Sequence, residues 1–226
     1  GLRVTCWIGS YLHARFFFRH PTDYRRLDFQ NIEDATWQRL KAPLTAAQAA
    51  RLNDYLTRRY VHGKSFDVKE FKSYKGSSEA LAVRLGLTRG KKTWGILAHV
   101  NWDCVSDFAP MLFQDFNEWI ITTLRELESD DSVNWLLKVH PAEAWDNPAT
   151  GVQAFVRKHF RRLPAHIQIV GYDEDVNPLD FFNLIDGAVT VYGTAGLEIA
   201  CLGKPVIVGG LAHYSRKGFT YDPETQ

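Results

Sequence analysis

The segment 187–208, GAVTVYGTAGLEIACLGKPVIV, predicts a strand, a glycine-rich turn, a helix and a second strand in direct succession. An apolar run ends at Tyr192, a helical pattern starts at Thr194, and a new apolar run follows Pro205. Short apolar strands that alternate with helices are typical of a parallel sheet whose two faces are both covered by helices. The segment therefore indicates the α/β class.

The same alternation extends upstream. Residues 94–99 (WGILAH) form an apolar run of strand length, and the segment 115–128 places its apolar side chains on one face of a helix. We predict a Rossmann-like parallel sheet with helices on both faces over residues 91–226, and in such sheets ligands bind beyond the carboxyl ends of the strands. The other expected elements are strands at 133–139 and 166–170 and helices at 152–160 and 178–184.

Residues 1–90 show no repeated β-α unit. They contain a predicted helix at 45–59 with Thr45 as its N-cap, a second helix at 77–85, and a strand-like run at 4–8. We interpret this mainly helical part as the remainder of an N-terminal domain and a linker, which ends where glycine and charge cluster near residue 90. The chain opens on glycine rather than methionine, so we expect it to be a fragment of a longer protein.

Charge and cysteine content limit the classes of function. The 27 Lys and Arg residues nearly balance the 26 Asp and Glu residues, so no overall field would draw the protein to nucleic acid and any anion site must be local. The basic, aromatic run at 15–26 is therefore interpreted as a solvated surface or an interdomain contact. Three cysteines without C-x-x-C spacing indicate reduced thiols and a cytoplasmic protein, and no apolar run has the length of a membrane span. No Cys/His cluster has zinc spacing, so no metal site is expected.

The glycine-rich turn is the strongest candidate for a binding site. The first N–H groups of a helix are unpaired and lie at the positive end of its dipole, so the hydroxyl of Thr194 and the neighbouring N–H groups of Ala195 suit a phosphate. Gly193 and Gly196 would let a ligand approach the backbone closely. Glu198, one turn into the helix, can reach the hydroxyls of a ribose. The alternative is an ordinary strand-to-helix turn.

His140 lies at the predicted carboxyl edge of the sheet, where Pro141 ends the strand and fixes the direction of the imidazole. A histidine there can donate to a phosphate oxygen and offset charge on a leaving nucleotide, with Lys138 beside it and Glu143 three residues later. The alternative is a structural histidine. The glycine-rich turn at the same edge favours the ligand role.

Polar residues also follow two other predicted strands. His99, Asn101 and Asp103 come directly after the run 94–99, and Asp103 is a candidate base. The alternative is a turn in which Asn and Asp bond to their own backbone. The last strand leads into a glycine-punctuated loop whose Tyr214, Gly218 and Thr220 could surround a sugar, or which is simply a mobile surface loop.

Three stretches together resemble a known family: WGILAHVNWD (94–103), LLKVHPAE (136–143) and VYGTAGLEIACLGKPVIVGG (191–210). The series is similar to the nucleotide-sugar-binding half of bacterial capsule and surface-polysaccharide glycosyltransferases of the GT-B fold. The resemblance implies two Rossmann-like domains that face each other across a cleft, with the donor held mainly by the C-terminal one. It also implies that His140 and Thr194 bind the donor phosphate and that Glu198 binds ribose or sugar hydroxyls.

We therefore expect a glycosyltransferase that uses a CMP- or UDP-linked sugar and needs no metal or other cofactor. The acceptor would be a growing surface polysaccharide or glycolipid at the cytoplasmic face, where other capsule assembly proteins would hold the enzyme at the inner membrane. A sugar-nucleotide 2-epimerase and a non-catalytic sugar-nucleotide-binding module are the alternatives. The expected catalytic residues are Asp103 and His140; the expected substrate-binding residues are His99, Asn101, Lys138, Glu143, Gly193, Thr194, Ala195, Gly196, Glu198, Tyr214, Gly218 and Thr220.

Overall fold

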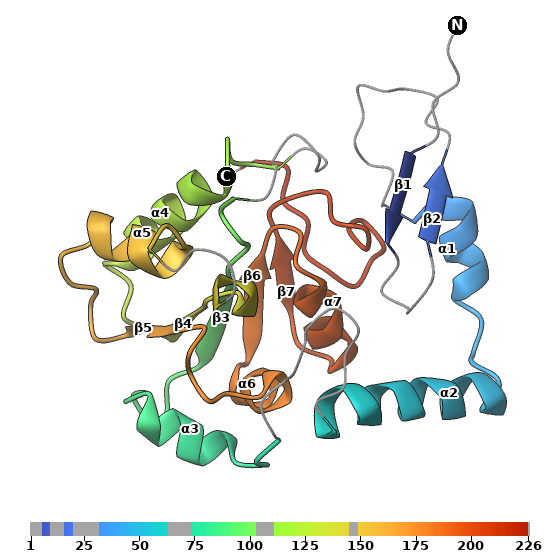
Figure 1. The fold of residues 1–226 in the computed structure, drawn as a ribbon, viewed down its shortest axis with the longest axis horizontal. Helices are drawn as coiled ribbons and strands as arrows, with labels where there is room; N and C mark the ends of the chain where they lie inside the picture. Colours follow the sequence, from blue (N-terminus) through green and yellow to red (C-terminus); the bar gives the residue numbers. More distant parts are fainter. Residues whose placement is uncertain are drawn as a thin grey trace, which may run out of the picture.

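A five-stranded parallel sheet forms the centre of the protein (Figure 1). The computed structural model describes residues 6–9, 16–19, 32–62, 74–102, 111–144 and 149–225. The strand order is β5-β4-β3-β6-β7, and every pair of neighbours is parallel. This confirms the predicted α/β fold. The strands are β3 (Thr93–Leu97), β4 (Asn134–Lys138), β5 (Ile167–Val170), β6 (Gly187–Thr190) and β7 (Val206–Val208).

Helices flank the sheet on both sides. Helices α4 and α5 pack against each other, α6 packs against α3, and these two pairs lie on opposite sides of the sheet in Figure 1. The helices that connect the strands are α4 (Phe116–Leu127), α5 (Val152–His159), α6 (Pro178–Leu184) and α7 (Thr194–Cys201). Apolar side chains from strands and helices share one core, in which the fully buried members include Ile96, Leu136, Leu137, Ala188, Trp119, Leu124, Phe181 and Ile199.

Local capping explains where the expected helices begin. The Asp115 carboxylate accepts from the N–H of Glu118 at the start of α4. Asn177 accepts from the N–H of Leu179 at the start of α6, where Pro178 is preorganised for the first helical position. Because these signals lie within a few residues, the predicted ends of the elements of the α/β unit are right to within one or two residues.

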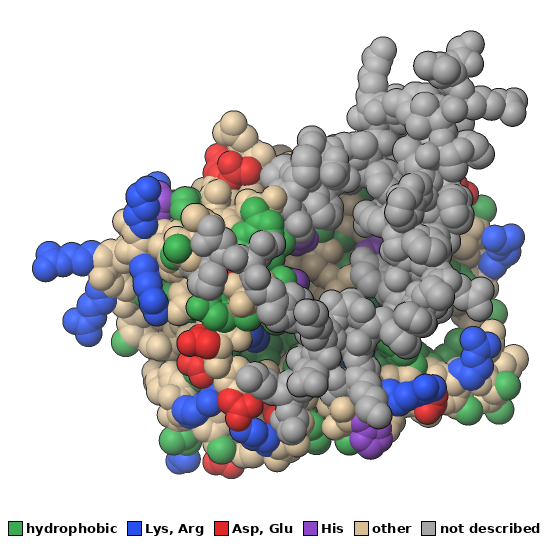
Figure 2. All heavy atoms as spheres, in the orientation of Figure 1, with side chains coloured by type: hydrophobic (Ala, Val, Ile, Leu, Met, Phe, Trp, Pro, Cys, Tyr) green, Lys and Arg blue, Asp and Glu red, His purple; other side chains and the backbone are tan. Residues whose placement is uncertain are grey.

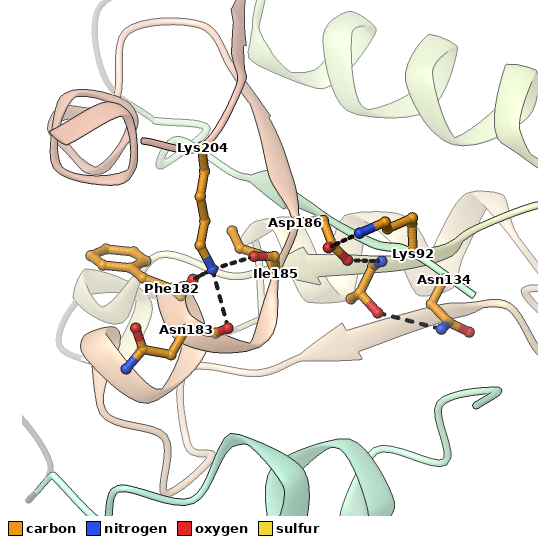
Figure 3. A network of polar contacts seen from close by, with 8 residues as sticks. Lys92, Asn134, Phe182, Asn183, Ile185, Asp186 and Lys204 are labelled. Atoms are coloured by element: carbon orange, nitrogen blue, oxygen red, sulfur yellow. Dashed lines mark hydrogen bonds and ion pairs between the residues drawn. The ribbon is translucent and has the colours of Figure 1, made fainter. Parts of the chain in front are cut away.

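A polar network joins the amino ends of the strands, at the edge opposite the predicted binding edge (Figure 3). The ammonium of Lys204 donates to the carbonyls of Phe182, Asn183 and Ile185, at 2.6, 3.1 and 2.5 Å. These carbonyls belong to the C-terminal end of α6, where helical carbonyls lack intrahelical partners. The lysine of the Gly-Lys-Pro stretch therefore secures α6 rather than contacting a ligand.

The N-terminal part contains two elements that the pattern did not predict. These are strand β2 (Phe16–Arg19), which pairs antiparallel with β1 (Cys6–Gly9), and helix α1 (Asp34–Leu40). The expected helices are present as α2 (Ala46–Leu56), with a capping box at Thr45, and α3 (Ser78–Arg84). Helix α2 ends earlier than expected because its last turn widens into the π-helix η2 (Thr57–Val61).

Parts of this N-terminal segment belong to the same core as the sheet. Leu81 of α3 and Tyr60 of η2 are both 7% exposed and pack with the buried side chains of the α/β unit. The domain boundary near residue 90 stays a prediction, since packing continues across it.

Candidate functional site

The strand order places a topological switch point between β3 and β6. From β3 the chain continues to β4 on one side of the sheet, and from β6 it continues to β7 on the other side. Open α/β sheets bind ligands beyond the carboxyl ends of the strands at such a switch point. His99 follows β3 and Thr194 follows β6, so the structure brings these two predicted residues to the switch point.

Aromatic rings from three neighbouring strands line this edge. The ring of His99 stacks on Phe116 at a centroid distance of 4.4 Å and faces His140 at 6.4 Å with an interplanar angle of 24°. Tyr192 meets the ring of His99 edge-on at 6.4 Å. Burial raises the pKa of the Tyr192 phenol, which therefore stays protonated. Figure 2 shows histidine side chains near the middle of the viewed face, whereas Lys and Arg side chains project mainly at its margins.

His140 is held in one tautomer. The N–H of Ala142 donates to its Nδ1 at 3.1 Å, because Pro141–Ala144 turns back in the short 3₁₀ helix η4. An Nδ1 atom that accepts a hydrogen bond carries no proton, so a neutral His140 has its N–H at Nε2. This arrangement supplies a donor suited to a phosphate oxygen.

Near His140 in the sequence, Glu143 is fully buried, whereas Lys138 is half-buried, as His140 itself is. Burial lowers the pKa of Lys138 from 10.5 to about 8, while the nearby Glu174, Asp173 and Glu143 act in the opposite direction. Nζ of Lys138 donates to the carbonyl of Val139 at 3.3 Å. The lysine is therefore only partly charged near pH 8.

Glu143 caps the start of helix α5 with its carboxylate. The side chain is fully buried, and Oε1 accepts from the N–H of Val152 at 2.7 Å. Gly151 has no side chain, and a Cβ there would collide with the carboxylate. Burial raises the pKa of Glu143, and the hydrogen bonds from the start of α5 oppose that rise. Its predicted contact with a ligand would require it to leave this position.

The glycine-rich turn is built around a buried tyrosine. Helix α7 begins at Thr194 as expected, and the hydroxyl of Tyr214 donates to the carbonyl of Gly193 at 2.7 Å. A Cβ at Gly196 would lie against this hydroxyl and against the methyl group of Thr190. Gly196 therefore makes room for Tyr214. Tyr214 is 1% exposed and supports the turn from within. The roles of Gly196 and Tyr214 toward a ligand stay predictions.

Glu198 has a partner that the sequence did not suggest. Its Oε1 accepts from Nη2 of Arg59 at 3.0 Å, and the two side chains are 22% and 8% exposed. Arg59 lies in η2, far away in sequence, and no local pattern marks it as part of a site. Thr190 was missed for a similar reason: its hydroxyl, at the end of an apolar strand, accepts from the N–H of Gly193.

The loop after β7 is fastened to the N-terminal segment. Lys217, 8% exposed, donates to Asp34 of α1 at 2.9 Å, and Nε1 of Trp37 donates to the Lys217 carbonyl at 3.1 Å. Gly218 adopts a positive φ of 88°, and Thr220 donates to Asp222 at 2.9 Å. The roles of Gly218 and Thr220 toward a sugar stay predictions.

Asn101 ties the segment after β3 to its surroundings. Nδ2 donates to the carbonyl of Thr150 at 2.8 Å and to Asn117 of α4 at 3.2 Å. Asp103, the candidate base, lies outside the described residues. Within the described ranges, no group of three or more His, Cys, Asp or Glu residues is placed to hold a metal ion. In the same part of the chain, no helix is long and apolar enough to cross a membrane.

The fold is a Rossmann-like α/β domain, and the candidate site lies at its topological switch point. The model of the family described as "Capsule polysaccharide biosynthesis protein" matches residues 10–226, and the chain belongs to this family. No curated protein sequence gives a significant match.

Two solved structures from Thermosulfurimonas dismutans are similar to this chain, and the first shares its fold. The first, "KpsC, beta Kdo 2,4 transferase", has a TM-score of 0.58 and 19% identity over 99% of this chain and 66% of that chain. The second, "KpsC, beta Kdo 2,7 transferase", has a TM-score of 0.46 and 16% identity over 88% of this chain and 50% of that one. The chain thus spans about two thirds and half of these proteins.

Proposed function

We propose that this protein is a glycosyltransferase that moves a sugar from a CMP- or UDP-linked donor to a growing capsular polysaccharide, surface polysaccharide or glycolipid. The observation that carries the proposal is the placement of His99, His140 and the first turn of α7 at the carboxyl edge of the sheet, around the switch point. Membership of the capsule family supports this reaction class, and a neighbour titled as a Kdo transferase makes a CMP-linked acidic sugar the first donor to test.

The proposed chemistry places negative charge where the site has donors. The acceptor hydroxyl oxygen bonds to the anomeric carbon, while the bond from that carbon to the phosphate oxygen breaks and its electron pair stays on the nucleotide. Nε2–H of His140 and the N–H groups at the start of α7 would stabilise that charge, and Lys138 would contribute when protonated. A base takes the proton of the acceptor hydroxyl, and Asp103 is the candidate.

The partners and location follow from this proposal. Donor and acceptor would meet at the cytoplasmic face, other capsule assembly proteins would hold the enzyme at the inner membrane, and no cofactor would be needed. A second Rossmann-like domain in the GT-B arrangement would complete the cleft.

A panel of nucleotides tests the proposed donor class. CMP, UDP, GDP and their sugar conjugates are added to the protein, and the shift in thermal unfolding is measured. A ligand at a hundred times its dissociation constant stabilises the folded state by about 2.7 kcal/mol. We expect a shift with CMP or UDP compounds, and release of nucleotide that depends on an acceptor once the cleft is complete. The absence of any shift, or turnover of a UDP-sugar without an acceptor, contradicts the proposal.

A further inference from the structure

Two adjacent arginines in η2 have opposite environments. Arg58 is exposed and pairs with Asp54 one turn earlier, on the surface. Arg59 is 7% exposed and points into the protein. Successive side chains of a helix point about 100° apart, so one of two neighbours can face solvent while the next faces the core. Single π-helical turns of this kind are frequent at functional sites.

Arg59 and its neighbour Tyr60 fix η2 against the α/β unit. The Arg59 guanidinium donates to Glu198 of α7 and lies 5.7 Å from the centroid of the Tyr60 ring. The carbonyl of Tyr60 accepts from Nδ2 of Asn177, the N-cap of α6, at 3.1 Å. These polar contacts join the N-terminal segment to helix α7 and to the start of helix α6.

The guanidinium of Arg59 favours the ionised form of the Glu198 carboxylate. A buried charge is stable only when an opposite charge and hydrogen bonds compensate for lost solvation, and a guanidinium in contact favours the ionised carboxylate. A carboxylate has about four lone-pair sites and can therefore accept from more than one donor. Glu198 is 22% exposed and lies one turn from the start of α7, within reach of a ligand bound there.

We propose that Arg59 is a positioning residue of the donor site: it holds Glu198 ionised and in the orientation that accepts from the ribose hydroxyls of the nucleotide. This inference rests on the proposed function. It makes the donor site composite, because the α/β unit supplies the carboxylate and the N-terminal segment supplies the group that fixes it. Binding of the nucleoside part of the donor therefore depends on a docked η2.

Calorimetric titration of CMP, UDP and inorganic pyrophosphate tests the role. R59M is expected to bind the nucleotide bound by the unmodified protein about tenfold more weakly, the scale of one hydrogen bond to a charged group. Pyrophosphate lacks ribose, so its affinity should not change. R59K keeps a cation beside Glu198 and should recover most of the loss. R58M removes the neighbouring, exposed arginine and should behave as the unmodified protein does.

A double-mutant cycle separates positioning from folding. R59M leaves Glu198 without its cation and should melt at a lower temperature, whereas R59M/E198Q removes both charges and should regain part of that loss. If Arg59 acts through Glu198, the double variant binds nucleotide no more weakly than E198Q alone. R59K and the double variant decide the question even where R59M is poorly folded.

The failures are distinguishable. Weaker binding of E198Q with unchanged binding of R59M and R59K overturns the positioning role and leaves the proposed function standing. A further tenfold loss in the double variant, or an equal loss for pyrophosphate, also overturns it, because Arg59 would then act on the fold. Absence of CMP and UDP binding by the unmodified protein overturns the proposed function and this inference with it.

Discussion

The hydroxyl of Tyr214 donates to the carbonyl of Gly193 in the space that Gly196 leaves by lacking a side chain. The contact joins the loop after β7 to the turn before α7, so the geometry of the helix N-terminus depends on a buried residue of that loop. Tyr214 of the loop after β7 and Gly196 of the glycine-rich turn, which the sequence places in separate candidate motifs, therefore pack together.

Removal of the Tyr214 hydroxyl should loosen this turn. Tyr214→Phe leaves the Gly193 carbonyl without its donor and is expected to lower the free energy of unfolding by about 0.5–1.5 kcal/mol. Gly196→Ala places a Cβ against the same hydroxyl and should cost about 1–3 kcal/mol. Urea unfolding measures both. Tyr221→Phe, at a tyrosine that is 66% exposed, is the control, and an equal loss there would contradict the explanation.

His140→Ala should weaken binding of the nucleotide without unfolding the protein. The donor at Nε2 is oriented by the bond from Ala142 to Nδ1, and a hydrogen bond to a charged group contributes about 1.5–3 kcal/mol. Calorimetric titration with the nucleotide identified by the thermal panel gives the affinity. His159→Ala, at an exposed histidine of α5, serves as the control. Unchanged affinity together with a large loss of stability would show that His140 is structural.

Lys138 should make stability depend on pH above neutrality. Its pKa is lowered to about 8 in the folded protein, against 10.5 ordinarily, so between these values the unfolded chain binds the proton that the folded protein has lost. Stability therefore rises as pH rises from about 8 toward 10.5, because the cost of the buried charge disappears. Urea unfolding at pH 7.5 and 9.5 should show this gain in the unmodified protein and not in Lys138→Met.

The control for that experiment is Lys158→Met, at an exposed lysine of α5, which should keep the pH-dependent gain. The affinity of the protein for the nucleotide gives a second measurement. If the charged form of Lys138 helps to hold the phosphate of the donor, this affinity should fall as pH rises through about 8. A gain in stability that is equal in Lys138→Met would mean that other groups cause it.

The chain alone should bind donor but not transfer sugar. It spans 66% of the first KpsC structure, and alignment of donor and acceptor between two domains can supply about 7–11 kcal/mol of the barrier. The test compares nucleotide release by this chain and by one extended upstream, with a donor that both bind and a glycan acceptor. Acceptor-dependent turnover at equal rates would disprove the expectation and make Asp103 the first residue to replace.

Local sequence pattern was sufficient to predict the α/β unit and the edge of the sheet at which the candidate residues lie. Apolar runs of strand length and caps such as Asn177 define the elements, because these signals act over a few residues. His99, His140 and Thr194 were predicted at one edge because the carboxyl ends of parallel strands meet there. The elements β2 and α1 were not predicted, because β2 lies within the basic run 15–26 that was interpreted as a surface, and α1 begins after Glu33 without a side-chain cap.

The sequence by itself determined the fold class, the carboxyl edge that carries the candidate site and the start of α7. Only the tertiary structure decided that Glu198 pairs with Arg59, that Glu143 serves α5 and that Tyr214 lies beneath Gly196. The physical reason is the range of the forces involved. Periodicity and capping are satisfied within one or two turns of chain, whereas a buried polar group is satisfied by whichever partner the packed fold brings to it, at any distance in sequence.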